Sequence, residues 1–198
     1  MTQTHIRAPG RAWNRDLWRG LAFGPLAFLS ACEGVMTQAH HYGSDVINRF
    51  QYAGAERDFT TVIVGNPFSV PNETVERLVT DAMQDRHFGA STHFTTNPSD
   101  NARRMFRVVM MFDPPEALAG GALCGDVADL PRASRADGRL RLLTAFCADD
   151  YLESEVAASM PRVGSPDAPA FGGMIGAVMR DILPTRDPGE EGCDIAPC

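Results

Sequence analysis

The most apolar stretch in the middle of the chain is Arg104-Met105-Phe106-Arg107-Val108-Val109-Met110-Met111-Phe112. Successive side chains of a strand point to opposite faces, so every second residue of this stretch shares a face. One face carries Phe106, Val108, Met110 and Phe112, and the other carries Val109 and Met111. Because both faces are apolar, the pattern predicts a central strand that is covered on both sides. Asp113-Pro114-Pro115 ends it, since proline does not continue a sheet ladder.

Four further strands are expected around this central one. Residues 59–64 are rich in β-branched side chains and stop at the turn signal Gly65-Asn66-Pro67. Residues 92–96 make a short strand. Residues 139–147 place Leu140, Leu142, Thr144 and Phe146 on one face. Residues 151–160 follow the short turn Ala148-Asp149-Asp150 and predict the returning strand rather than a helix.

Two helices are predicted from apolar residues at helical spacing. The first covers residues 72–87, with Asn72 as its cap and Gly89 as its stop, and we expect Leu78, Val79 and Met83 to be buried. The second follows Ser165-Pro166-Asp167 and ends before Pro184. Its apolar stripe is Phe171, Met174, Ile175, Val178, Met179 and Ile182.

This order of elements predicts an α+β fold, a two-layer sandwich in which two main helices pack on one face of a mainly antiparallel sheet. The domain is expected over residues 58–188. Residues 32–57 are polar and predict a tether, with a short helix over residues 44–52 as the alternative. Residues 114–138 predict a long connection, and residues 189–198 predict a flexible C-terminal tail.

The first 31 residues have the layout of an export signal. Arg7, Arg11, Arg15 and Arg19 precede an apolar run of 12 residues, from Gly20 to Ala31. A membrane-spanning helix needs about 20 apolar residues, so this run is too short for a permanent span. We therefore expect residues 1–31 to be a signal peptide.

The end of that run, Leu29-Ser30-Ala31-Cys32, resembles the lipobox of bacterial lipoproteins. In that family the peptidase recognises the residues before the cysteine, and the cysteine thiol carries the lipid. The resemblance implies cleavage after Ala31, lipid on Cys32 and attachment to a membrane. The alternative is an ordinary cleaved signal with a chance cysteine. The implied location is the periplasmic side of the cell envelope, on the inner or the outer membrane.

The order of elements over residues 58–188 also resembles small α+β domains of proteobacterial envelope lipoproteins. This resemblance rests on element order and carries no catalytic residue over. The absence of catalytic motifs and the design of a single anchored domain favour a lipid-anchored accessory or assembly protein without catalytic activity, which works through an envelope protein partner. After Cys32 the chain has 14 arginines and 24 acidic residues, a net charge of −10, which disfavours a nucleic acid as partner.

The cysteines are informative because their number after Cys32 is even. Cys124, Cys147, Cys193 and Cys198 remain, which predicts two disulfides in an oxidising compartment. Four cysteines allow three pairings, and local pairing favours Cys124–Cys147 and Cys193–Cys198. The first bridge would attach the long connection to a strand. The tail cysteines have the alternative of bridging two molecules.

Few residues suggest catalysis, and no cofactor or metal is expected. The alternative function is a small envelope hydrolase or metal-binding enzyme in which His87 and His93 combine with Asp85 or Asp100. We expect the acids Asp149, Asp150, Glu153 and Glu155 to form a solvated charged turn. Gly172, Gly173 and Gly176 lie on the last helix, where we expect close packing against the sheet rather than a dinucleotide site.

Overall fold

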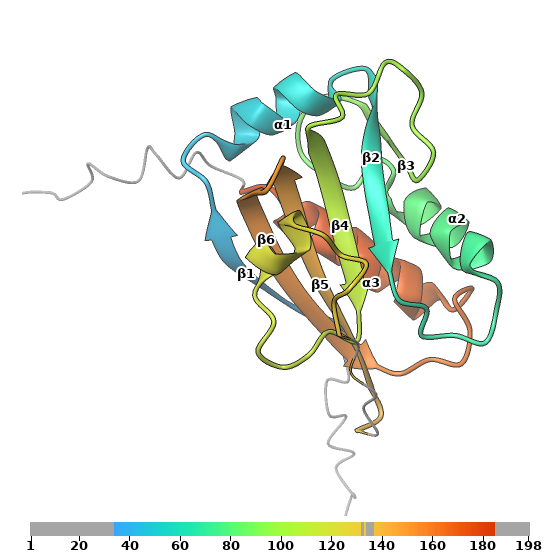
Figure 1. Ribbon diagram of the computed structural model, residues 1–198. Helices are drawn as coiled ribbons and strands as arrows, with labels where there is room; N and C mark the ends of the chain where they lie inside the picture. Colours follow the sequence, from blue (N-terminus) through green and yellow to red (C-terminus); the bar gives the residue numbers. More distant parts are fainter. Residues whose placement is uncertain (1–33, 132, 134–136, 185–198) are drawn as a thin grey trace, which may run out of the picture. The chain divides into compact units, whose positions relative to one another are not determined.

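The computed structural model describes residues 34–131, 133 and 137–184 (Figure 1). The six strands of the described residues form one sheet, and loops of varied length connect the helices to the strands. The elements, in chain order, are β1 (Met36–Tyr42), α1 (Val46–Gly54), β2 (Arg57–Val64), α2 (Asn72–Met83), β3 (Thr92–Thr95), β4 (Phe106–Phe112), the 3₁₀ helix η1 (Gly120–Cys124), β5 (Arg139–Ala148), β6 (Tyr151–Pro161) and α3 (Pro169–Asp181).

The sheet has the strand order β1-β6-β5-β4-β2-β3. β4 pairs antiparallel with β5, β5 with β6, and β6 with β1. The two remaining pairings, β2 with β4 and β2 with β3, are parallel. The fold is α+β, as the sequence predicts. β2 and β3 are parallel because α2 carries the chain back between them, which is the usual connection between parallel strands. Residues 96–105 then lead from β3 past β2 to β4, which also runs parallel to β2.

The central strand is β4, and its two faces separate as the alternation predicts. Phe106, Val108, Met110 and Phe112 belong to the main core, whereas Val109 and Met111 belong to a second, smaller core on the opposite face. All three helices contribute buried side chains to the main core, with Phe50 from α1, Val79 from α2 and Ile175 from α3 as examples. The helices therefore share one face of the sheet.

The other face of the sheet is covered by residues 113–131, which we call the crossing loop. η1 lies within this loop, and Figure 1 shows it on the side of the sheet opposite α3. Leu123 and Cys124 of η1 are buried against Leu143 and Ala145 of β5. The long connection expected from the sequence is thus a packed layer, which explains why both faces of β4 are apolar.

The prediction of a tether over residues 32–57 was wrong for residues 36–54, which form β1 and α1. β1 pairs with β6 from Met36↔Ser159 to Tyr42↔Ser154. The alternative helix was the better interpretation of the next segment, because Val46 and Phe50 of α1 are fully buried. The polar composition of β1 is that of an edge strand, and its partner lies more than 100 residues away in the sequence.

β1 is also attached to the end of α3. The Tyr42 hydroxyl donates to the carbonyl of Asp181 at 2.6 Å, and the Thr37 hydroxyl donates to the Asp181 carboxylate. Burial raises the pKa of Tyr42, and the charge of Asp181 raises it further. Beside it, the Ser154 hydroxyl donates to the carbonyl of Ile182 at 2.6 Å. The first strand and the last helix of the domain are therefore joined directly.

Helix α2 differs from its prediction in three details. It ends at Met83, well before Gly89, because Gln84 leaves the helix and its side chain bonds Thr80 and Phe94 on β3. Asn72 is not a cap but accepts a hydrogen bond from the Asn66 side chain. Leu78 is only partly buried, whereas Val75, Val79 and Met83 are buried as core residues.

The strand pairings define two ends of the sheet. At one end, which we call the Met36 end, β1 begins, β4 and β6 finish, and β5 begins. At the other end, the α1 end, Tyr42 is followed by α1 and the turn Asp149–Asp150 joins β5 to β6. Figure 1 shows α1 across that end of the sheet.

Candidate functional site

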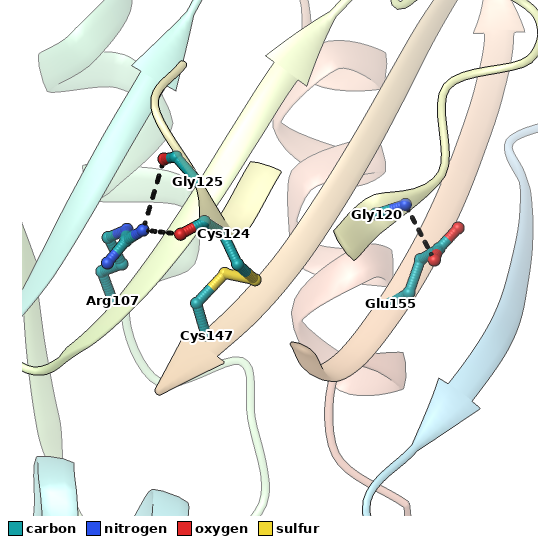
Figure 2. The surroundings of a disulfide bond; sticks show 6 residues. All are labelled: Arg107, Gly120, Cys124, Gly125, Cys147 and Glu155. Atoms are coloured by element: carbon teal, nitrogen blue, oxygen red, sulfur yellow. Dashed lines mark hydrogen bonds between the residues drawn. A yellow bond between two sulfur atoms is a disulfide. The ribbon is translucent and has the colours of Figure 1, made fainter. Parts of the chain in front are cut away.

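A disulfide joins the crossing loop to the sheet (Figure 2). It links Cys124 of η1 to Cys147 of β5, with 5.4 Å between the Cα atoms, and both residues are buried. This is the pairing that the sequence predicts. The bond closes a loop of 23 residue steps, and the residues of that loop that the structure describes contain no strand before β5. It therefore holds the least regular segment of the domain against the sheet.

Three hydrogen bonds hold the crossing loop on either side of the disulfide (Figure 2). The Arg107 guanidinium on β4 donates to the carbonyls of Cys124 and Gly125. The backbone N–H of Gly120 donates to the Glu155 carboxylate on β6 at 2.9 Å. A Cβ at position 120 would come within 2.6 Å of that carboxylate, so glycine allows the close approach.

A groove of about 330 Å³ lies between the start of the crossing loop and strands β5 and β6. Its polar lining comes from His40, Glu116, Arg141 and Glu155. Glu155 already accepts the Gly120 N–H, and Arg141 lies 2.6 Å from the Asp137 carboxylate. The groove can accept a side chain or a small polar molecule, and two of its charged groups, Glu155 and Arg141, already have partners within the protein.

His87 is built into the aromatic part of the core. Its ring lies 5.1 Å from the Phe50 ring and 5.3 Å from the Phe94 ring, measured between centroids. Nε2 lies 3.0 Å from the carbonyl of Ala90. Nδ1 is buried without a hydrogen-bond partner. This surrounding of apolar rings makes His87 a packing residue.

His93 lies on β3 next to Phe94, so its side chain points to the face opposite that of Phe94 and His87. The two histidines predicted as a possible cluster are therefore not brought together. The partner of His93 is Asp58 on the adjacent strand β2, with 2.8 Å between Nδ1 and Oδ1. The residues proposed as partners, Asp85 and Asp100, take no part, and Asp100 instead pairs with Arg104.

Asp58 is the centre of a small cluster of hydrogen-bonded polar residues, the Asp58 cluster, which the sequence did not reveal. Its Oδ2 accepts hydrogen bonds from the Ser99 hydroxyl at 2.6 Å and from the Ser99 N–H at 2.9 Å. The bonds from the Ser99 hydroxyl and from His93 lower its pKa to about 2. Asn101 accepts a bond from the Asp58 N–H. The Asp58 cluster therefore attaches residues 99–101 to β2.

The order of groups in the Asp58 cluster differs from that of a catalytic triad. In a triad the histidine stands between serine and aspartate, so that it can remove the serine proton. Here Asp58 stands between Ser99 and His93. The hydroxyl proton is held by a carboxylate whose pKa is about 2, which makes that carboxylate a weak base. The arrangement stabilises a loop and does not activate Ser99.

The acidic residues that were predicted to form one solvated charged turn differ in their exposure. Asp149 and Asp150 are exposed at the β5–β6 turn, as expected. Glu153 is buried in the irregular pairing of β6 with β5, and its carboxylate lies 2.7 Å from the Arg49 guanidinium of α1. Within the described residues, no group of three or more His, Cys, Asp or Glu side chains is placed to hold a metal ion.

The glycines of α3 face α2 as well as the interior. A Cβ on Gly172 would meet Ala82 of α2 at 3.9 Å, and one on Gly176 would meet Arg86 at 3.6 Å. A shallow groove of about 330 Å³ follows this contact. The expectation that these glycines pack closely against the sheet was wrong: their nearest neighbours lie at ordinary contact distance on or just after α2, and a Cβ on Gly173 would meet no atom within 4 Å.

Among the large side chains exposed at the α1 end of the domain are those of Tyr52 on α1, Met105 just before β4 and Tyr151 at the start of β6. Tyr52 is 57% exposed, Met105 46% and Tyr151 73%. Met105 accepts the backbone N–H of Asp149 at 2.6 Å, which places it beside the turn that leads to Tyr151. The Tyr52 ring lies 6.1 Å from that of Phe106, the neighbour of Met105. We call Tyr52, Met105 and Tyr151 the aromatic corner.

The aromatic corner could not be found from the sequence. Its three residues are separated by up to 99 positions, and each lies at or next to the end of an element, where alternation gives no information on exposure. The predicted lipidation residue Cys32, the recognition residues Leu29, Ser30 and Ala31, and the tail cysteines Cys193 and Cys198 lie outside the described residues.

In the part of the chain that the structure describes, no helix has the length and apolar character needed to cross a membrane. No protein-family model matches the chain, and no curated protein matches it. Among solved structures, the PelC dodecamer from Paraburkholderia phytofirmans is similar at 9% identity, over 77% of this chain and 99% of that chain, with a TM-score of 0.40. A likeness at this level carries no information on activity.

Proposed function

We propose that this protein is a lipid-anchored lipoprotein of the bacterial cell envelope and that it acts as an accessory or assembly protein by binding another protein. The observation that carries the anchoring is Leu29-Ser30-Ala31-Cys32 at the end of a short apolar run. The lipid on Cys32 would hold the protein on the periplasmic side of the inner or the outer membrane.

The disulfide supports export to that compartment. Disulfides persist in the periplasm and are rare in the cytosol of mesophiles. The Cys124–Cys147 bond is buried between η1 and β5, where it serves packing rather than exchange with other thiols. An exported protein is the kind in which such a structural bond forms.

The aromatic corner supports a binding role. Tyrosine and methionine are enriched in the centres of protein interfaces, and exposed apolar side chains that gather at one place mark such surfaces. Tyr151 is the most exposed of the three, at 73%. The described site residues, by contrast, are bonded to one another in ways that hold the fold together. We therefore assign the corner to a protein partner.

Labelling cells with a clickable fatty acid tests the anchor. The wild-type protein should take up the label and partition into detergent, and Cys32→Ser should give an unlabelled precursor of higher mass. Cys193→Ser is the matched control, since it removes a thiol and leaves Cys32 in place. An unlabelled wild-type protein would refute the anchoring.

A photo-crosslinking amino acid placed in living cells tests the binding surface. At Tyr151 it should form a discrete cross-linked species with one envelope protein, and Met105→Ser in the same chain should weaken that species. The same group at Gly121, an open position on the crossing loop, is the control. Equal cross-linking from both positions would contradict the assignment of the corner.

A further inference from the structure

The domain begins almost immediately after the proposed lipid attachment site. Val35 already packs against the main core, and β1 starts at Met36. Three residue steps separate Cys32 from Val35, and an extended chain of that length spans at most about 11 Å. A tether over residues 32–57, by contrast, would have a root-mean-square length of about 28 Å if it behaved as a flexible coil.

The start of β1 lies at one end of the sheet. Met36 pairs with Ser159, two residues before β6 finishes at Pro161. The N–H of Arg162 then bonds the carbonyl of Gly138, just before β5 begins. β6 has 11 residues, and strands rise by about 3.3 Å per residue, so the β5–β6 turn lies about 35 Å from this end.

We propose that the bilayer surface is the partner of the Met36 end, so that the domain stands on the membrane with the aromatic corner pointing away from it. This inference rests on the proposed lipid anchor. The short chain before Val35 holds Met36 within reach of the lipid headgroups. Met36 is 61% exposed, and an apolar side chain of this kind suits the membrane interface.

The orientation decides where a partner can bind. Protein partners are excluded from the Met36 end, because the bilayer occupies the space beside it. The turn Asp149–Asp150 and Tyr151 lie at the far end of β6 and stay accessible. The protein therefore presents its aromatic corner at a fixed height of roughly one strand length above the membrane. A partner must itself be held near the membrane or extend down to it.

Two fluorophore positions measure this orientation in the lipidated full-length protein. Gly164 lies three residues after β6 at the Met36 end, and a side chain there meets no atom within 4 Å. Asp150 is exposed at the opposite end. Gly164→Cys and Asp150→Cys are labelled separately in a Cys193→Ser, Cys198→Ser background. The protein is placed in phospholipid vesicles that contain a lipid with a nitroxide quencher on its headgroup.

The fluorophore at Gly164 should be quenched several-fold more strongly than the one at Asp150. A Gly/Ser insertion of about 20 residues after Gly34, with a root-mean-square length of about 25 Å, should abolish this difference. Equal quenching at both positions would show that the domain lies flat, and quenching at neither would show that it stands clear of the bilayer; either result overturns the orientation. The mass of the purified protein is measured first, because an absent lipid refutes the proposed function itself.

Discussion

Asp58 shows how much a single residue contributes to the attachment of a loop. It accepts three hydrogen bonds, two from Ser99 and one from His93, and these bonds favour its charged form. The pKa of Asp58 in the folded protein is about 2, below its ordinary value of 3.8. The bonds therefore stabilise the fold above the ordinary pKa, and this stabilisation is lost as the pH falls from 3.8 towards 2.

Replacing Asp58 by asparagine should lower the stability at pH 7 by about 1–2 kcal/mol, because an amide cannot accept all of these bonds. The difference between the wild-type protein and Asp58→Asn should shrink as the pH is lowered below 4 and vanish as the pH falls below 2. Thermal melting at a series of pH values measures it. Asp100→Asn is the control, since Asp100 has only an exposed pair with Arg104 and should change little at any pH.

Helix α2 tests the sequence prediction of buried positions at the scale of an element. The apolar stripe predicts that Leu78, Val79 and Met83 are all buried, yet only Val79 and Met83 are part of the core. The apolar face of a helix is wider than the part of its surface that neighbouring elements cover. Leu78 lies at its margin, and only the packing of α2 against α3 and the sheet decides which positions are covered.

Truncating Met83 to alanine should therefore cost about 2–5 kcal/mol, which is the usual range for a buried methionine. Leu78→Ala, the matched control on the same helix, should cost clearly less, because much less of its surface is removed from water. Denaturant unfolding of both variants gives the comparison. Equal losses would mean that the edge of α2 is as tightly packed as its centre.

The crossing loop is an element whose stability depends on a covalent bond. Its core residues, such as Leu123, are few, and the disulfide ties them to β5. Removing the bond by Cys124→Ser together with Cys147→Ser should lower the free energy of unfolding by about 3 kcal/mol on the loop-entropy account. We expect the helices on the other face to keep their packing without it.

Hydrogen exchange followed by mass spectrometry should locate that effect. Amides of residues 117–131 should exchange much faster in the double variant, whereas those of α2 and α3 should change little. The Cys193→Ser, Cys198→Ser protein serves as the control for loss of two thiols. Uniformly faster exchange over the whole domain would show that the loop is required for the fold and is not a separate layer.

At the scale of the whole molecule, the domain is larger than its sequence pattern suggests. The aromatic rings of Phe50 on α1 and Phe59 on β2 stack at 5.0 Å, so α1 completes the main core. β1 covers the edge of β6 and binds α3 through Tyr42. A domain that begins at residue 58 lacks both contributions.

A fragment of residues 34–188 should therefore fold cooperatively, and a fragment of residues 58–188 should not. The shorter fragment loses Val46 and Phe50 from the core and leaves the backbone of β6 unpaired on one side. Proton NMR and thermal melting distinguish the two. A well-dispersed spectrum and a sharp melting transition of the shorter fragment would contradict the contribution of β1 and α1.

The sequence by itself determined the regular elements of the interior and one covalent link. β4 and β5 were predictable because alternation of apolar side chains is a local property of a strand buried on both faces. The Cys124–Cys147 bond was predictable because short separation favours pairing. The proposed export signal and the proposed lipid site at Cys32 also rest on one contiguous segment, and they stay predictions.

The tertiary structure alone decided the rest, since each remaining feature joins segments that are distant in the sequence. β1 lacks a regular apolar alternation and becomes a strand through its pairing with β6. The Asp58 cluster joins β2 to residues more than 30 positions away. The residues of the aromatic corner come from three different elements or their flanks. Local patterns record which residues avoid water, but they carry no information on which distant backbone or side chain supplies the partner.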